Sequence, residues 1–293
     1  MTEIGQLKHP ASGITPTPFV LCADDFGIAP GVSHAICELI AAGRLSATSC
    51  MTSMPFWPEH ARWLAPLQDK ADIGLHLTLT DQRPLGPMPK LAPEGRLPSL
   101  GALLSRAFTG RLERAEIAAE LARQYEAFVA AFGRDPDFID GHQHVHVLPV
   151  VRSTVLDLLR RHAGPRRPWL RSCHEPLQSI LRLGVSPLRA GVISVLARRL
   201  DRTARRLGIA TNNGFRGVYD FSGDEPYGRL FERFVDGAAA NLLVMCHPGQ
   251  VDHHLRAVDT LTDQREVEFA YFMSESFAET LHARKLRLAR LSA

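Results

Sequence analysis

Four short segments of the chain carry side chains that could bind a metal ion or transfer a proton. The segments are residues 22–27 (CADDFG), 74–77 (GLHL), 141–146 (GHQHVH) and 245–249 (MCHPG). Each lies at or near the carboxyl end of an apolar run that is typical of a buried strand. Because the carboxyl ends of parallel strands meet at one mouth of an α/β sheet, we expect these carboxylates and imidazoles to lie close together.

The adjacent acids Asp24 and Asp25 follow a buried strand, where two carboxylates are costly unless a charge or hydrogen bonds satisfy them. A divalent metal ion would satisfy them. Side chains of consecutive residues diverge, so one carboxylate could bind the metal while the other stays free as a base. His76 and His142 would complete a three-ligand site with an open position for water, which is the pattern of a catalytic metal. The predicted chemistry is therefore metal-assisted hydrolysis.

Three further histidines, His144, His146 and His247, lie in the same motif segments. In a strand, His142, His144 and His146 would share one face, whereas in a curled chain His142 and His146 could pair as i, i+4 partners. One site does not need all three, so His144 and His146 are candidates for substrate binding or for support of the ligands, or they are structural. His247 ends a buried strand before a Pro-Gly turn and could act as general acid to a leaving amine.

The elements that must position these residues alternate along the chain. Strands are predicted at residues 19–23, 48–54, 71–80, 137–147, 169–173, 211–215 and 241–246. Helices are predicted up to residue 42 and at residues 58–67, 99–109, 113–132, 149–162 and 187–207. This alternation predicts an α/β fold with a mostly parallel sheet, in a single barrel-like domain (19–293) after an N-terminal extension (1–18). The proline-rich segment 83–98 is predicted to be a loop that covers the mouth and sets specificity.

The composition excludes several classes of protein. The formal charge of +3 is too small to indicate a nucleic-acid partner. Five scattered cysteines, odd in number and without C-x-x-C spacing, argue against a disulfide framework and for a reducing compartment. We find no apolar stretch of signal-peptide or membrane-spanning length, so we expect a cytoplasmic protein. The sequence leaves open whether the chain forms a homo-oligomer.

Four motifs resemble those of the YdjC-like carbohydrate deacetylases, from about residue 19 to residue 275. They are ADDFG at 23–27, GLH at 74–76, DGHQHVH at 140–146 and MCHP at 245–248. That group includes diacetylchitobiose deacetylases and hopanoid-biosynthesis deacetylases. The resemblance implies a distorted (β/α) barrel, similar to a TIM barrel. It also implies metal-dependent removal of the acetyl group from an N-acetylated amino sugar, either a chitooligosaccharide or a glycolipid such as a hopanoid N-acetylglucosaminide.

Residue by residue, the resemblance implies that Asp25, His76 and His142 bind the metal. Asp24 falls where the family has its general base, and His247 where it has its general acid. The family is usually assigned Mg²⁺. Two imidazoles and one carboxylate would equally suit Zn²⁺ or another transition metal, because Mg²⁺ prefers oxygen ligands.

Two weaker candidates for sugar binding lie outside these motifs. Arg171 lies in a segment similar to the family strand that supplies an arginine near the substrate. Asn213 is a candidate on its position alone. The chain departs from some members at Gly141, where they carry serine, and at Gln143, where they carry histidine. Neither departure affects an assigned ligand.

The segment 187–207 is predicted to be a basic amphipathic helix. Leu188, Val192 and Val195, with Leu196 and Leu200, can form one face, while Arg198, Arg202, Arg205 and Arg206 form another. We favour a peripheral barrel helix with a solvated arginine face. The alternative is a surface that approaches an anionic membrane or a lipid-linked sugar.

Two other functions stay open at this point. The same site could hydrolyse an ester, a phosphoester or another amide, although no lysine or arginine cluster accompanies the motifs to bind a phosphate. The chain could also be a catalytically silent barrel that binds a sugar or a lipid.

Overall fold

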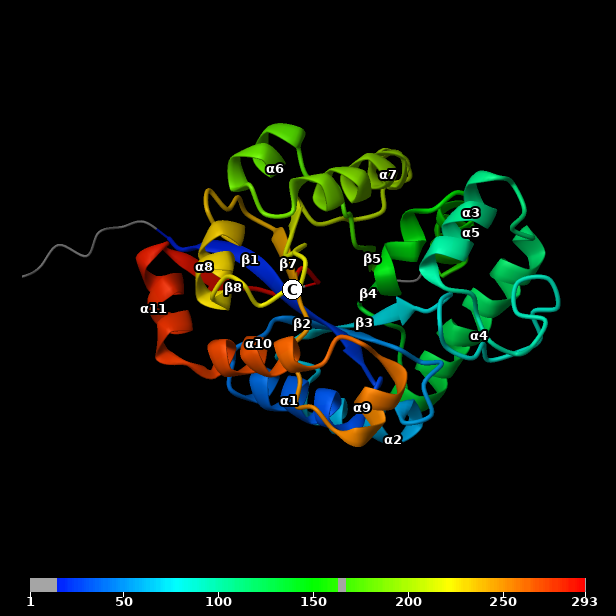
Figure 1. Cartoon of the computed structure of the whole chain (residues 1–293), viewed down its shortest axis with the longest axis horizontal. Helices are drawn as coiled ribbons and strands as arrows, with labels where there is room; N and C mark the ends of the chain where they lie inside the picture. Colours follow the sequence, from blue (N-terminus) through cyan, green and yellow to red (C-terminus); the bar gives the residue numbers. More distant parts are fainter. Residues whose placement is uncertain (1–14, 163–166, 293) are drawn as a thin grey trace, which may run out of the picture.

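A computed structural model describes residues 15–162 and 167–292 of the chain. Figure 1 shows a curled sheet at the centre with helices around it. Seven strands follow one another in the order β5-β4-β3-β2-β1-β7-β6, and every pairing is parallel. They are β1 (Thr17–Phe26), β2 (Ala47–Cys50), β3 (Asp72–Leu77), β4 (Phe138–Gly141), β5 (Trp169–Leu170), β6 (Phe215–Arg216) and β7 (Leu242–Cys246). The predicted α/β fold is confirmed.

The strand order makes this sheet a distorted barrel. Strands β1 to β5 pair in chain order, and β7 returns to pair with β1. The seam between β5 and β6 is crossed by a single parallel bridge between Leu170 and Thr211, where the Leu170 N–H donates to the Ala210 carbonyl at 2.9 Å. An additional short strand, β8 (Leu286–Leu288), pairs with the beginning of β1.

Helices cover the outside of the barrel. They are α1 (Pro30–Ala41), α2 (Trp57–Leu64), α3 (Leu100–Phe108), α4 (Arg114–Phe132), α5 (Val151–Arg161), α6 (Leu177–Leu183), α7 (Pro187–Arg206), α8 (Tyr227–Phe234), α9 (His253–Val258), α10 (Asp263–Met273) and α11 (Glu275–Ala283), with short 3-10 turns η1 (Ala65–Leu67) and η2 (His142–Val147). Strands β2, β3, β4, β5 and β7 are buried throughout, as expected for parallel strands covered on both faces. None of the helices in the described part of the chain is long and apolar enough to cross a membrane.

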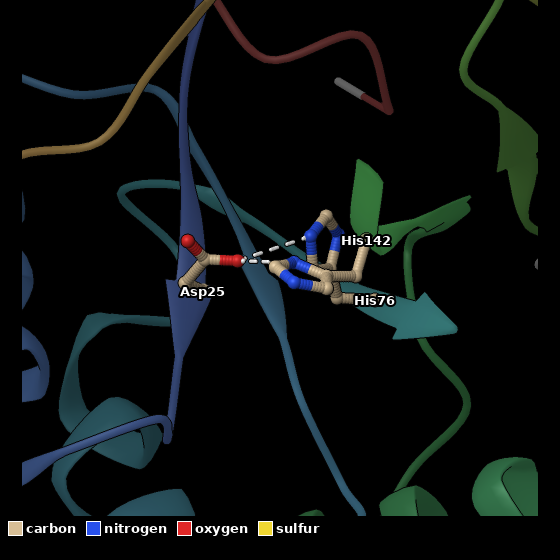
Figure 2. A group of neighbouring side chains, drawn as sticks. All are labelled: Asp25, His76 and His142. Atoms are coloured by element: carbon tan, nitrogen blue, oxygen red, sulfur yellow. Dashed lines mark hydrogen bonds and ion pairs between the residues drawn. The ribbon is translucent and has the colours of Figure 1, made fainter. Parts of the chain in front are cut away.

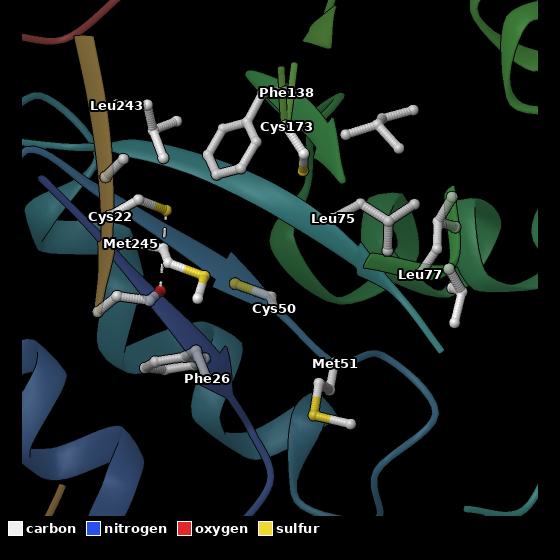
Figure 3. Packing of buried hydrophobic residues seen from close by; sticks show 14 of the residues in the cluster. Cys22, Phe26, Cys50, Met51, Leu75, Leu77, Phe138, Cys173, Leu243 and Met245 are labelled. Carbon is white, nitrogen blue, oxygen red and sulfur yellow. Dashed lines mark hydrogen bonds between the residues drawn. The ribbon is translucent and has the colours of Figure 1, made fainter. Parts of the chain in front are cut away.

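Close packing inside the barrel depends on small residues. Figure 3 shows Cys22, Phe26, Leu75 and Phe138 in the core. A Cβ atom on Gly74 would lie 2.4 Å from the Phe138 ring, so any larger residue there would force this ring, or the pairing of β3 with β4, to shift. All five cysteines are unpaired, and burial raises the thiol pKa of Cys22, as it does for the other buried cysteines, which makes them inert.

Several predicted boundaries are wrong. Strand β1 begins at Thr17, inside the N-terminal extension predicted at 1–18. Residues 1–14 of that extension lie outside the described residues. The strand predicted at 137–147 ends at Gly141, because Gln143 and His144 adopt positive φ values of 51° and 61° and the chain turns into η2. The ladder therefore stops before all three histidines of that segment.

The helix predicted at 187–207 is present as α7, but its apolar face is divided. Leu200 is buried against the barrel with small or polar residues, namely Ser194, Ala197, Asp201 and Ala204. Leu188, Val192 and Val195 point into solvent instead. The expectation that these residues share one face with Leu200 is therefore wrong.

Candidate metal centre and active site

Asp24 and Asp25 lie near the end of β1, where an irregularity changes the direction of their side chains. Between two paired positions β1 advances from Ala23 to Phe26 while β2 advances from Thr48 to Cys50, so β1 contains one extra residue. Asp25 has a φ of 67°, in the left-handed region that aspartate tolerates better than most residues. A bulge of this kind re-aims a side chain. Asp25 consequently reaches His76 on β3 and Asp24 reaches Arg171 directly after β5, and neither strand is a neighbour of β1.

Asp25 meets two imidazoles, as Figure 2 shows. Its Oδ1 lies 2.9 Å from Nδ1 of His142 and 3.3 Å from Nε2 of His76. One ligand atom from each of the three residues lies within 4.8 Å of the others. A carboxylate oxygen and two imidazole nitrogens at this spacing suit a divalent metal with further positions open. The structure thus brings together the three residues predicted to bind the metal.

Asp140 contacts the ring nitrogen of His76 that faces away from Asp25. Its Oδ1 lies 2.7 Å from Nδ1 of His76, and Ser49 hydrogen-bonds both side chains. A carboxylate on one ring nitrogen fixes the tautomer and leaves the other nitrogen for a metal. Burial by itself would lower the pKa of His76, but Asp140 prevails and raises it to about 10, so a metal ion that binds Nε2 would displace a proton from it. The sequence shows Asp140 directly before Gly141 and His142, but its pattern alone does not indicate this supporting role.

Asp24 is held by Arg171. The two guanidinium nitrogens of Arg171 lie 2.7 and 2.6 Å from the two carboxylate oxygens, and Nη2 also lies 2.7 Å from Oδ2 of Asp140. Burial raises the pKa of Asp24, but Arg171 outweighs burial and the pKa falls below its ordinary value. Arg171 itself has 0% exposure. In this structure Arg171 therefore orients Asp24 from the interior, and its contact with a sugar stays a prediction.

Arg265 of α10 contacts the second oxygen of Asp25. Its Nη2 lies 2.6 Å from Oδ2 of Asp25 and 2.7 Å from Oδ2 of Asp259. Burial raises the pKa of Asp25, and the opposing effects of His142 and Arg265 bring it well below the ordinary value. The ionised Asp25 therefore directs only Oδ1 at the imidazoles. Arg265 has no recognisable motif around it in the sequence.

His247 follows β7 at the same mouth and is partly exposed. Its backbone N–H donates to Glu268 at 2.5 Å, and the Tyr219 hydroxyl donates to the other oxygen of Glu268. Its ring packs edge-on against Phe221, and within the described residues its Nδ1 has no hydrogen-bond partner. Burial lowers the pKa of His247, with Asp25 and Asp24 acting in the opposite direction. The backbone is thus fixed while a ring nitrogen stays unpaired.

The turn η2 sends its three histidines to different places. His142 meets Asp25, whereas His146 is buried with Nε2 3.2 Å from the Arg171 carbonyl and 3.5 Å from Sγ of Cys173. His144 is half-buried beside Cys173 and packs edge-on against Phe215. Neither expected arrangement, one shared strand face or an i, i+4 pair, is present. His146 supports the backbone of Arg171.

Asn213 lies away from this group. It is exposed, and its backbone N–H donates at 2.8 Å to the carbonyl of Asn241, the residue before β7 begins. Asn213 is therefore at the amino end of β7, whereas His247 follows the carboxyl end. The expectation that Asn213 contacts the sugar is not supported by this position.

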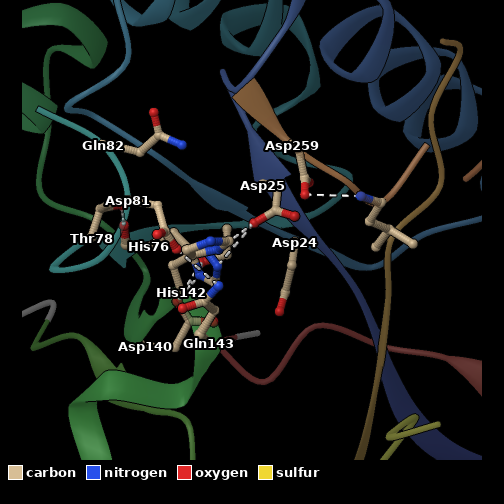
Figure 4. A network of polar contacts seen from close by, with 12 residues as sticks. Asp24, Asp25, His76, Thr78, Asp81, Gln82, Asp140, His142, Gln143 and Asp259 are labelled. Carbon is tan, nitrogen blue, oxygen red and sulfur yellow. Dashed lines mark hydrogen bonds and ion pairs between the residues drawn. The ribbon is translucent and has the colours of Figure 1, made fainter. Parts of the chain in front are cut away.

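The residues just before the loop predicted at 83–98 border the site. Figure 4 shows Asp81 and Gln82 beside His76 and His142, and the Gln143 amide lies 3.4 Å from Asp81. Further along, backbone N–H groups of the loop donate to α4, with Leu85 bound to Glu120 and Leu91 to Glu116. Helix α4 thereby fixes the loop next to the mouth.

Comparisons with known proteins agree with this geometry. A family model described as YdjC-like protein matches residues 18–283, which include all four motif segments. A carbohydrate deacetylase of Geobacillus stearothermophilus is 31% identical over 278 residues, covering 93% of this chain and 96% of that protein. A chitooligosaccharide deacetylase of Proteus mirabilis (strain HI4320) is 30% identical over 273 residues, covering 92% and 95%. A solved structure from Enterococcus faecalis V583 has the same fold, with a TM-score of 0.74 at 20% identity over 94% of this chain and 97% of that one.

Proposed function

The chain belongs to the YdjC-like family, and from this premise we propose that it is a metal-dependent hydrolase that removes the acetyl group from an N-acetylated amino sugar. The relatives named carbohydrate deacetylase and chitooligosaccharide deacetylase support this proposal. The observation that carries it is the convergence of His76 and His142 on Oδ1 of Asp25, beside the ionised Asp24. This arrangement combines a metal site with a general base.

Asp25, His76 and His142 would hold the metal ion. When bound, a divalent metal supplies Lewis acidity, which lowers the pKa of a coordinated water and polarises the amide carbonyl. Mg²⁺ is the assignment from family resemblance, whereas the two imidazole donors fit Zn²⁺ or another transition metal better. Asp140 supports the site by keeping Nε2 of His76 free.

Asp24 and His247 would transfer the protons. Asp24 is ionised and oriented by both nitrogens of Arg171, so it can accept the proton of the attacking water. His247 would then protonate the departing amine, and Glu268 fixes its position through the backbone. Arg171 also contacts Asp140, so one buried network joins the base to the metal ligand His76.

The finer substrate and the location are part of the proposal. We propose an N-acetylglucosamine conjugate, either a chitooligosaccharide or a lipid-linked glycoside such as a hopanoid N-acetylglucosaminide. The five unpaired cysteines support a reducing compartment such as the cytoplasm.

The test is acetate release from a panel of N-acetylglucosamine conjugates, including diacetylchitobiose and a lipid-linked glycoside. We expect the wild type to release acetate from at least one conjugate and Asp24→Asn to lose that activity. Asp224→Asn, which changes an exposed acid, is the matched control and should retain it. Equal activity in Asp24→Asn and the wild type would contradict the assigned base.

A further inference from the structure

Helices α6 and α7 expose an unusual amount of apolar surface. In Figure 1 they form the outermost layer on one side of the barrel. Leu177 and Leu181 of α6 are 64% and 63% exposed, and they lie one turn apart. Leu188, Val192 and Val195 of α7 are 83%, 54% and 74% exposed. The two helices contact each other, and their exposed apolar side chains are together called the α6–α7 patch here.

Along the solvent-facing side of α7, apolar side chains are followed by arginines. Positions that share this side recur at i, i+3 and i+4 spacing. They are Leu188, Val192, Val195, Arg199, Arg202 and Arg206. The first half of this stripe is apolar and the second half is cationic, and all six residues are exposed. The arginines thus extend the apolar patch along the same face.

The charge of this segment differs from that of the rest of the chain. Residues 177–206 contain seven arginines and a single acid, Asp201, which gives a net charge of +6. The whole chain carries only +3, so the remaining residues together carry −3. Asp201 is buried and pairs with Arg205, so no acidic side chain is exposed on either helix. All seven arginines are exposed.

We infer that the α6–α7 patch docks the protein on an anionic lipid bilayer. Large exposed apolar patches mark interaction sites, and the excess of arginine specifies a negatively charged partner. A helix that lies in a membrane interface combines buried leucine and valine side chains with arginines that meet anionic headgroups. The stripe on α7 has this combination, with the apolar residues on its first turns and the arginines on its last turns.

Docking through this patch would place the catalytic mouth close to the bilayer. Helix α7 packs against η2, which begins with His142, and Ser194 of α7 hydrogen-bonds His174 at 2.9 Å. A substrate anchored in the same membrane could then reach the site, although this consequence rests on the proposed function. The docking itself does not depend on catalysis.

Vesicle sedimentation of the full chain tests the inference. We expect the wild type to sediment with vesicles of phosphatidylcholine and phosphatidylglycerol at low salt, and not with phosphatidylcholine alone. Leu188→Ser with Val192→Ser and Val195→Ser should weaken binding at least about tenfold. Arg199→Gln with Arg202→Gln and Arg206→Gln should weaken it on the order of 100-fold.

Matched triple variants elsewhere serve as controls. Leu85, Phe108 and Val267 are exposed apolar residues, and Arg62, Arg96 and Arg111 are exposed arginines. Changing either set to serine or glutamine should leave vesicle binding unchanged, and circular dichroism should show all variants folded. Absence of wild-type binding, or equal loss in the patch and control variants, would overturn the inference. A dimer that is lost in the apolar patch variant, without vesicle binding, would show that a second copy covers the patch instead.

Discussion

Asp24 and Asp25 are adjacent in the chain but differ in what surrounds them. Arg171 occupies both oxygens of Asp24, whereas Asp25 gives one oxygen to Arg265 and keeps the other for two imidazoles. Burial favours the neutral form of both acids, yet the nearby cations keep both pKa values below their ordinary range. Two identical side chains thereby become suited to different tasks, one as a base and one as a ligand.

Asp140→Asn should weaken metal binding about 10- to 100-fold, because the amide no longer supports His76 as a carboxylate does. Titration calorimetry of the metal-stripped protein with Zn²⁺ measures this. Asp137→Asn is a suitable control, since Asp137 lies just before β4, at its opposite end, and pairs with Arg134. An unchanged affinity in Asp140→Asn would contradict the role of Asp140 in holding His76.

His247→Gln should separate proton transfer from metal binding. If His247 is the general acid, kcat should fall on the order of 100- to 10,000-fold while Zn²⁺ affinity stays at the wild-type value. Steady-state kinetics of acetate release and the same metal titration give both quantities. A variant that loses metal instead would place His247 among the ligands.

Glu268 should make stability depend on pH. Burial raises the pKa of Glu268 from 4.5 to about 7 in the folded protein, so between these values the folded state holds a proton that the unfolded state has lost. The free energy of unfolding should therefore decrease by about 3 kcal/mol as pH rises from below 4.5 to above 7.

Urea unfolding at pH 5 and pH 8 measures this contribution. Glu268→Gln should lose this pH-dependent contribution. The difference in the free energy of unfolding between the variant and the wild type should therefore change between pH 5 and pH 8. Glu266→Gln removes an exposed acid two residues earlier and should leave the pH dependence intact. Identical pH profiles for the wild type and Glu268→Gln would refute the assignment.

The site residues that lie in recognisable motifs could be found from the sequence, but the residues that hold them in place could not. Asp25, His76 and His142 were expected to meet and do so. Arg265 reaches the site from a helix in the last tenth of the chain, and only the folded structure shows that proximity. Arg171 was expected near the substrate from a resemblance and Asn213 from its position along the chain. Neither reveals whether a side chain faces the mouth, the interior or the opposite end of a strand.

At the scale of elements, the pairing of β3 and β4 depends on Gly74. Gly74→Ala should lower the free energy of unfolding by about 1 to 3 kcal/mol, because the added methyl group overlaps the Phe138 ring. Urea unfolding measures the change. Gly101→Ala places the same methyl group on helix α3, where no atom beyond its own stretch of chain lies within 4 Å of it, and should be neutral or stabilise by about 1 kcal/mol. Similar effects at both positions would contradict the packing argument.

Apolar periodicity predicted most of the strands and helices, since alternation and helical spacing follow from which faces are buried. The pattern failed at η2, where Gln143 and His144 take left-handed conformations without a glycine to signal the turn. It failed again at α7, where apolar side chains at helical spacing indicated a buried face. Small residues cover the barrel there, and Leu188 with its neighbours is left in solvent.

At the scale of the whole molecule, the barrel separates two kinds of surface. The mouth collects buried acids, histidines and arginines from β1, β3, β4, β7 and α10. The segment between β5 and β6, at the seam closed by one bridge, carries α6 and α7 with their exposed leucines and arginines. The proposed catalysis and the proposed docking can thus be tested independently, because different residues would carry them.

The central claim is that one metal ion at Asp25, His76 and His142 is required for deacetylation. Metal-stripped protein should be titrated with Zn²⁺, and separately with Mg²⁺, while acetate release from an N-acetylglucosamine conjugate is followed. Activity should be absent at the start and rise in proportion to bound metal until one ion is bound per chain. Full activity in the stripped protein, or saturation at another stoichiometry, would contradict the account.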